Sequence, residues 1–462
     1  MATTHYTTEQ LTERFEFAGK FKTFIYGMIG VGIVLLLAGF FMDHTGEGHH
    51  DDHATTEHVE ATHSDAGHGA DSHGDEAHHE AGAHDEGHGG HHKQPTTLTR
   101  LLANVLTSAL YFMTLTMGAT FFLFVHRVAN AGWQTAIRRI PEAIMQWIPV
   151  GVVIMILLFF AMPELYEWVW MPEGEDEIID SKRGYLNMTL FIIRNLLFFA
   201  FWIWAAFKYR SMSYSMDGTD KAGAITIFNK TLNLSAAFVV VFALSICLFA
   251  FDWIMSLEPH WFSTIFGIYV FAGSMVSGIT FMYAMVIFLQ KQGYLKWVND
   301  AHKHDLGKFV FGFSIFWGYI WVAQYLLIWY SNIPEEGIYY VKRYRTGDHA
   351  YLGYSTMFYF NILINFVTPF LMLMTRNAKR ISGFFLVVCC IIFYGHFHDL
   401  FLMVMPGAMG HNPGIGFMEI GTWLVFAGAF LFVVLTQLTK ANLASVNHPY
   451  MEESLAHSTG EV

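Results

Sequence analysis

The stretch ISGFFLVVCCIIFYGHFHDLFLMVM, residues 381–405, combines a long apolar run with three ionisable side chains. A helix of about 20 apolar residues crosses the hydrocarbon core of a bilayer, so the length of this run predicts a transmembrane helix. His396, His398 and Asp399 lie near its middle. A charged side chain at the centre of such a helix costs about 2.5–3.5 kcal/mol, so residues kept there face the bundle interior and are candidates for function.

The rest of the chain repeats this apolar pattern. Its 462 residues are 54% hydrophobic and only 14% charged, whereas a soluble domain carries about 25% charged residues. The apolar blocks are continuous rather than alternating, which favours helices over a membrane β-barrel. The sequence therefore predicts an all-α integral membrane protein, a bundle of about ten transmembrane helices. The predicted spans are residues 22–42, 101–125, 142–162, 186–208, 230–252, 263–289, 307–331, 354–375, 381–405 and 415–438.

Lysine and arginine are distributed unequally between the two sides of the predicted membrane. The chain has 26 lysines and arginines, of which 18 fall on the side of the N-terminus and 7 on the opposite side, while Arg194 lies within a span. Because basic residues are enriched in cytoplasmic loops, both termini are predicted to be cytoplasmic. The predicted organisation is a tail (1–21), a first transmembrane helix (22–42), a periplasmic histidine-rich loop (43–97), nine further transmembrane helices (98–439) and a second tail (440–462).

The histidine-rich loop has a low-complexity sequence. Between Asp43 and Pro95 it holds 14 of the 25 histidines and 13 acidic residues, and much of the net charge of −12. Its few apolar residues cannot form a core, so disorder is predicted. Divalent-metal binding, proton buffering and a merely tolerated insertion remain open as its role. Because the charge belongs to this loop and no basic groove is present, no nucleic-acid partner is indicated.

The three ionisable residues of the opening stretch differ in direction. His396 and Asp399 are three residues apart and share a helix face, so we expect Asp399 to accept a hydrogen bond from an imidazole. His398 points elsewhere and is expected to contact another helix. The uncharged Gln324 and Asn361, in other spans, are assigned to helix packing.

Further ionisable residues are predicted in the same outer half of the membrane. Arg194 is a natural partner for a buried carboxylate and would keep it ionised. Acids and imidazoles at successive depths suit proton transfer to the outer surface. The alternative hypothesis is that these side chains, and Glu419 with them, form hydrogen bonds that hold helices together. The candidate proton-relay residues are His396, His398, Asp399, Asp252, Arg194 and Glu258.

Motifs for cofactors are absent from the sequence. The three cysteines form no CxxC pair and no CxxCH, so four-thiolate iron–sulfur ligation and the usual c-haem attachment are excluded. Histidines do not face each other from two spans at mid-membrane, which argues against a bis-histidine haem, and a phosphate-binding GxxxxGK[ST] is missing. The aromatic stretch FWGYIWVAQYLLIWY, residues 316–330, is a candidate quinone or lipid groove, or an ordinary aromatic belt.

Four stretches of this chain resemble one family, namely EFAGKFKTFIYGMIGVGIVLL (16–36), AFDWIMSLEPHWFSTIFGIYVFAG (250–273), GFSIFWGYIWVAQYLLIWYSNIPEE (312–336) and HFHDLFLMVMPG (396–407). In these stretches the chain is similar to the NrfD/PsrC-like ten-span membrane subunits of alternative complex III, a bacterial quinol:cytochrome c (or quinol:oxidase) oxidoreductase. Within this family it is most similar to the ActF type. The likeness covers the ten spans but not the histidine-rich loop.

The resemblance implies a multi-pass subunit of the bacterial inner membrane. Its implied partners are a paralogous ten-helix subunit, an iron–sulfur subunit, c-type cytochrome subunits and lipid, with the iron–sulfur clusters and c-type haems in the partners. The quinol-oxidising paralogue typically carries Gly-His-Ala-Gly at the end of its second span, where this chain has ALYFMTLTMGATFFLFVHRV (109–128). The resemblance thus implies a subunit without its own redox cofactor, which scaffolds the complex and offers a proton route. A quinone groove on this chain is a further candidate feature, with menaquinone or ubiquinone and lipid as its candidate ligands.

Two other functions fit the sequence. A divalent-cation transporter would use the histidine-rich loop and the pair His396 and Asp399, although Asp252 is the only further ligand available at that depth. A purely structural membrane anchor would use the polar residues only to join helices.

Overall fold

The computed structural model describes residues 11–46, 95–344 and 353–458. Ten helices in this part are long and apolar enough to cross a membrane, which confirms the predicted all-α membrane bundle. The prediction for the histidine-rich loop lies almost entirely outside the described residues. The ten spans are α2 (Gly19–Gly46), α3 (Thr97–Val128), α4 to α6 (Arg139–Leu165), α9 (Met188–Asp217), α10 (Lys221–Trp253), α11 (Phe266–Lys291), α12 (Asp300–Ser331), α14 to α15 (Ser355–Leu373), α16 (Ser382–Met409) and α17 (Phe417–Leu438).

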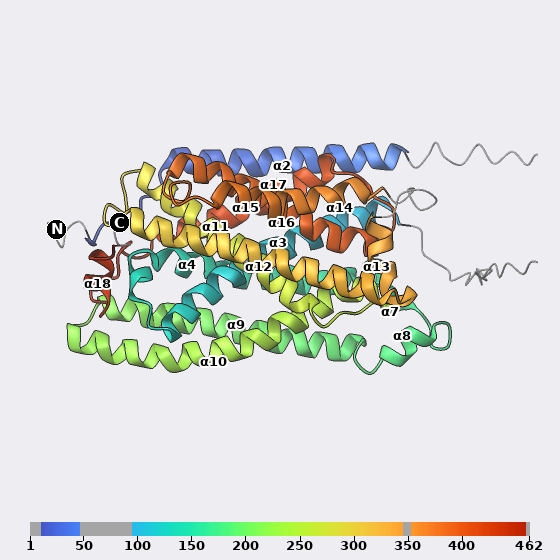
Figure 1. Cartoon of the computed structure of the whole chain (residues 1–462), viewed down its shortest axis with the longest axis horizontal. Coiled ribbons are helices and arrows are strands. Elements are labelled where there is room, and N and C mark those ends of the chain that lie inside the picture. Colours follow the sequence, from blue (N-terminus) through green and yellow to red (C-terminus); the bar gives the residue numbers. More distant parts are fainter. Residues whose placement is uncertain (1–10, 47–94, 345–352, 459–462) are drawn as a thin grey trace, which may run out of the picture.

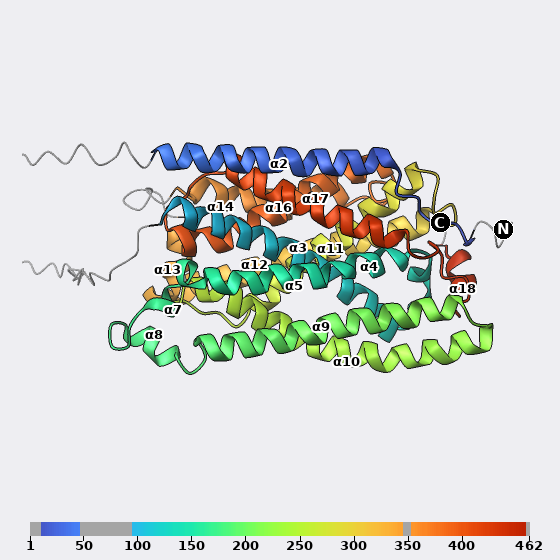
Figure 2. The ribbon, with the colours of Figure 1, turned by 180° about the vertical axis from the view of Figure 1, so that it is seen from behind.

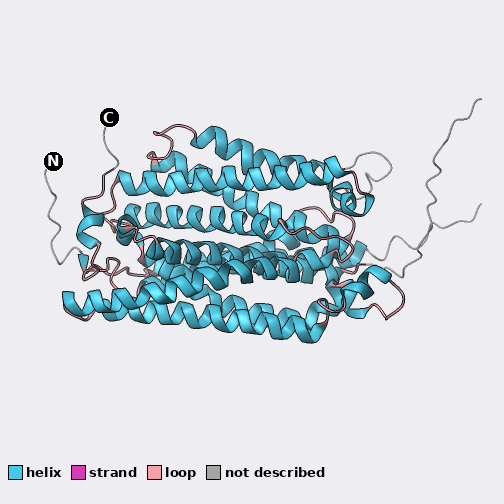
Figure 3. Cartoon of the chain, turned by 60° about the horizontal axis from the view of Figure 1, so that its bottom comes forward, coloured by secondary structure: helices cyan, strands magenta, loops and turns pink. Residues whose placement is uncertain are grey.

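All ten spans run roughly along the long axis of the molecule (Figures 1 and 2). Because their number is even, the described chain ends meet at one end of the bundle, beside α18 (Met451–Leu455). The short helices α7 (Glu167–Trp170), α8 (Glu177–Lys182) and α13 (Pro334–Tyr344) lie at the other end, which we call the α8 end. Figure 3 shows the described chain as helices joined by loops.

The helices extend beyond the predicted apolar runs because polar caps start them earlier. Thr96 caps α3, and its hydroxyl oxygen accepts a hydrogen bond from the backbone N–H of Thr99 at 3.2 Å. Asn299 caps α12 through the N–H groups of Ala301 and His302. Such caps satisfy N–H groups that have no partner within the helix, so polar first turns can precede the apolar part of a span.

Helix α3 lies at the centre of the bundle and α2 at its edge. Of the most apolar 18-residue segment of α3, 89% of the residues are buried, whereas only 11% are buried in the corresponding segment of α2. Close contact between α3 and α11 depends on Gly118, because a Cβ atom there would lie 1.9 Å from the carbonyl oxygen of Ser274. Small residues at such crossings let membrane helices approach at backbone distance.

The eighth span is not a continuous α-helix. It consists of α14 (Ser355–Ile362), a π-helical turn (Leu363–Val367) and α15 (Thr368–Leu373). Pro369 follows the π-helical turn and has no N–H to donate to the preceding turn. Wide turns of this kind are frequent at functional sites, and this one carries a side chain that belongs to the site described next.

Candidate functional site

Asp399 is the centre of a buried polar network that joins α16 to three other helices. Its buried carboxylate accepts hydrogen bonds from the hydroxyl of Tyr269 on α11 at 2.5 Å and from the side-chain amide of Asn361 on α14 at 2.8 Å. Its second oxygen accepts from the indole N–H of Trp317 on α12 at 3.2 Å. All three donors are neutral, and within the described residues no cation forms an ion pair with Asp399.

The π-helical turn supports this network from behind. Asn365 lies in the turn and donates to the side-chain oxygen of Asn361 at 2.6 Å and to the carbonyl of Gly395 at 2.8 Å. The first bond occupies the oxygen of Asn361, so its amide nitrogen is the group that faces Asp399. Asn361, which the sequence assigned to packing, is therefore in direct contact with the carboxylate.

The two imidazoles of the opening stretch do not bind Asp399. His396 packs edge-on against Trp317, with ring centroids 5.7 Å apart, and its Nε2 is buried without a hydrogen-bond partner. The predicted bond from an imidazole to Asp399 is wrong, because Tyr269, Asn361 and Trp317 already occupy the carboxylate. The prediction for His398 is confirmed, since its Nε2 lies 2.9 Å from the carbonyl of Met357 on α14.

Two small cavities meet at Asp399. One is lined by His396, Thr114 and Ser277, and the other by Asn361 and Arg343; Tyr269, Asp399 and Met403 line both. Each has a volume of about 20 Å³, which is enough for one water molecule. Asp399 thus separates a water-sized space next to His396 from a second one that leads toward the α8 end.

Arg343 connects the second cavity to Glu258. Its guanidinium donates to a carboxylate oxygen of Glu258 at 2.5 Å and to the carbonyl of Leu402 at 2.9 Å, and it lies 3.5 Å from the ring centroid of Tyr339. Burial alone would raise the pKa of Glu258, but the charges of Arg343 and Lys342 outweigh it and hold that pKa below its usual value. Glu258 is therefore an ionised group at the α8 end of the site.

Asp252 and Arg194 form a second, separate cluster between α9 and α10. Arg194 donates to both carboxylate oxygens of Asp252, at 2.8 and 2.6 Å, which confirms the predicted pairing of Arg194 with a carboxylate. Tyr185 and Asn195 complete the shell at 2.8 and 3.0 Å. Within the described residues no hydrogen bond joins this cluster to Asp399, and neither of the two cavities at Asp399 is lined by Asp252 or Arg194. The six predicted relay residues therefore do not form one hydrogen-bonded chain.

Glu419 belongs to a third cluster. It pairs with Arg100 at 2.8 Å and accepts from Asn104 at 2.9 Å, and Arg100 also binds Asp43. Gln324 lines the cavity beyond Asp399. The described part of the chain holds no group of three or more His, Cys, Asp or Glu residues that could hold a metal ion.

The aromatic stretch 316–330 is divided between two surroundings. Trp317 is buried at Asp399, whereas Trp329 and Tyr330 are 61% and 86% exposed. A groove of about 190 Å³ lined by Gln324, Leu327 and Ile328 adjoins the stretch. This volume lies below the range of about 300–1,000 Å³ that is usual for small-molecule pockets, and a quinone or lipid groove along the stretch stays a prediction.

Compared with known protein families and with curated proteins, the chain matches neither a family model nor a curated sequence. Its chemistry therefore follows from the geometry above. The site is a buried carboxylate with three neutral donors, a water-sized space on each side, and an ionised Arg343–Glu258 pair beyond. Such an arrangement can take up, hold and release a proton.

Proposed function

We propose that this chain is a membrane subunit of a bacterial quinol:cytochrome c (or quinol:oxidase) oxidoreductase, where it scaffolds the complex in the inner membrane and offers a proton route through Asp399. The observation that carries the proton route is the buried carboxylate between two water-sized cavities. The membrane-spanning bundle and the sequence resemblance support the assignment to the complex. Electrons would pass through iron–sulfur and c-type haem subunits bound to this one.

The surroundings of Asp399 allow the carboxyl group to exist in both protonation states. Burial without a cation favours the neutral acid, whereas the donors Tyr269, Asn361 and Trp317 favour the anion. A group held between these opposing effects can receive a proton from one side and pass it on to the other.

The proposed route runs along α16 toward the α8 end. A proton from the cavity beside His396 would reach Asp399 through one water molecule, and a second water would carry it toward Arg343 and Glu258. Lys342 lies 3.6 Å from Glu258 with its side chain 39% exposed, which marks where the route meets solvent. In this proposal the pair Arg194–Asp252 joins helices and carries no proton.

The test uses the whole complex reconstituted into vesicles, with proton release measured per electron transferred. Asp399→Asn keeps the size of the side chain but cannot take up the proton, so we expect proton transfer to slow by about 10²–10⁴-fold. Glu419→Gln is the matched control, because it removes a buried carboxylate that belongs to another cluster. Co-isolation of the chain with multihaem cytochrome and iron–sulfur subunits tests the assignment to the complex.

One other function is favoured by a specific observation. The bonds to Asp399 come from α11, α12 and α14, so they also lock four helices together and would suit a purely structural anchor. In that case Asp399→Asn would leave both turnover and proton release unchanged, and the proposed proton route would be abandoned.

A further inference from the structure

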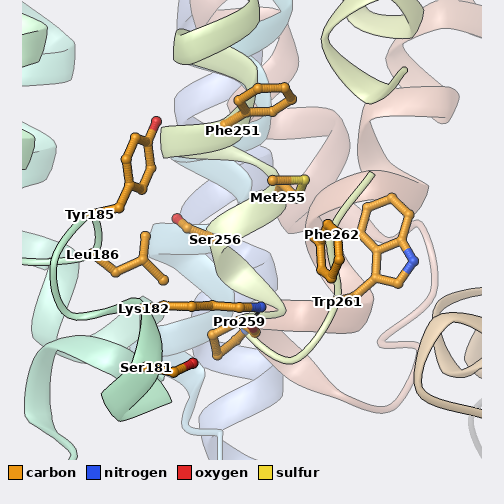
Figure 4. A pocket seen from close by; sticks show the side chains of 10 residues that line it. All are labelled: Ser181, Lys182, Tyr185, Leu186, Phe251, Met255, Ser256, Pro259, Trp261 and Phe262. Atoms are coloured by element: carbon orange, nitrogen blue, oxygen red, sulfur yellow. Dashed lines mark hydrogen bonds between the residues drawn. The ribbon is translucent and has the colours of Figure 1, made fainter. Parts of the chain in front are cut away.

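A larger pocket lies at the α8 end, away from the Asp399 network. It has a volume of about 330 Å³, within the range of ligand-binding pockets. Figure 4 shows Lys182 extended across the pocket, with its amino group beside Pro259 and with Met255 and Phe251 above it. Its walls come from the end of α8, the end of α10 and the connection that follows α10.

The pocket has its charged group, Lys182, at one end and the large apolar side chains Phe251 and Met255 at the other, beside the hydroxyl groups of Tyr185 and Ser256. Lys182 and Pro259 lie outside the membrane spans, whereas Phe251 and Met255 belong to the fifth span, Lys221–Leu257. The aromatic ring of Phe262, which is 57% exposed, lies at its rim. Its polar-to-apolar order therefore follows the order from headgroup to acyl chain in a lipid bilayer.

The carboxylates around the pocket are bound by groups other than Lys182. Asp252 is paired with Arg194, and Asp180 with Arg183. Asp176, the carboxylate that acts on Lys182 through space, is already bound by His260 at 2.6 Å and by two N–H groups at the start of α8. Within the described residues Lys182 forms no ion pair. Its amino group donates to the carbonyl of Pro259 at 2.5 Å and has two further N–H groups.

We propose that this pocket binds the phosphate group of an anionic phospholipid, with Lys182 against the phosphate and Phe251 and Met255 against the first methylene groups of the acyl chains. A basic residue at the membrane surface attracts anionic headgroups, and the aliphatic stem of a lysine packs well against apolar neighbours. Burial lowers the pKa of Lys182, and an anion beside the ammonium would oppose that effect.

The experiment measures phospholipid retained by the purified full-length protein in detergent, by native mass spectrometry. Added phosphatidylglycerol should be retained about fivefold more strongly than phosphatidylcholine, the ratio expected when one lysine meets a net negative headgroup. Lys182→Gln should remove this preference and Lys182→Arg should keep it. Lys208→Gln is the matched control, because Lys208 is an exposed lysine of α9 that does not line the pocket.

A second variant keeps the test valid if Lys182→Gln impairs folding. Met255→Trp fills the apolar part of the pocket while Lys182 stays in place, and it should also reduce retention of phosphatidylglycerol. Equal retention of the two lipids by the unmodified protein would overturn the proposal. So would equal losses in Lys182→Gln and Lys208→Gln, or displacement of the lipid by millimolar inorganic phosphate, which would identify a free anion as the ligand.

Discussion

Removal of Arg194 should destabilise the bundle more than removal of its partner. The side chain of Asp252 is 0% exposed, and in the described part of the chain Arg194 is its only ion-pair partner. Arg194→Leu would leave the carboxylate with the hydrogen bonds of Tyr185 and Asn195 but without a cation. Breaking a buried pair in this way costs about 3–5 kcal/mol, and the two remaining donors place our expectation at about 3 kcal/mol.

The reverse substitution should be milder. Asp252→Asn removes the charge from the buried position, and Arg194 is 17% exposed and lies 4.0 Å from the ring centroid of Tyr185. The cation can therefore turn toward water or rest on the ring, so we expect a loss of about 1–3 kcal/mol. The double variant Arg194→Leu/Asp252→Asn contains neither charge and should be no less stable than Arg194→Leu alone.

The assay is loss of helicity in mixed micelles of increasing denaturing-detergent content, for the unmodified chain, the two single variants and the double variant. This cycle isolates the coupling between the two side chains, for which contacting residues give about 0.5–3 kcal/mol. If the losses of the two single variants simply add in the double variant, the two charges are not coupled and the reasoning is refuted.

Two further predictions concern a helix crossing and a pH dependence. Gly118→Leu should prevent the approach of α3 to α11 and abolish cooperative unfolding, whereas Gly27→Ala, where a Cβ atom meets nothing within 4 Å, should leave the unfolding curve unchanged. Burial would raise the pKa of Glu258, but the cations of α13 hold it low in the folded state. The ionised Glu258 therefore stabilises the folded chain above the unfolded-state pKa of about 4.3. This stabilisation should be lost as the pH falls through the lower folded-state pKa. Unfolding curves between about pH 6 and pH 3 should show this loss in the unmodified chain and not in Glu258→Gln; a parallel loss in both would contradict the assignment.

The spans were predictable because each is a local property of the sequence. A continuous apolar block of about 20 residues needs no knowledge of its neighbours to be recognised. The pairing of Arg194 with a carboxylate could also be predicted, because a cation at that depth requires a partner. Even so, the sequence offered several carboxylates, and the choice of Asp252 depends on the packing of α9 against α10.

The partners of Asp399 could not be predicted from its own helix. Spacing along α16 shows which residues share a face, but not which helices lie opposite that face. The donors come from three other helices and are Tyr269, Trp317 and Asn361. Two of them are aromatic, and in a chain that is 17% aromatic the sequence does not distinguish them from packing residues. Arg343 was missed because it lies in a connection between spans, on the short helix α13.

The π-helical turn at Leu363–Val367 amounts to one additional residue in the eighth span. Each residue of an α-helix turns the chain by about 100°. Without the additional residue, the two halves of this span would have a different rotational phase, and the amide of Asn361 and the buried side of α15, with Pro369 and Leu373, could not both be oriented as they are. A single-residue deletion within the turn would therefore act at a distance on proton affinity, by withdrawing one donor from a carboxylate that the deleted residue never touches.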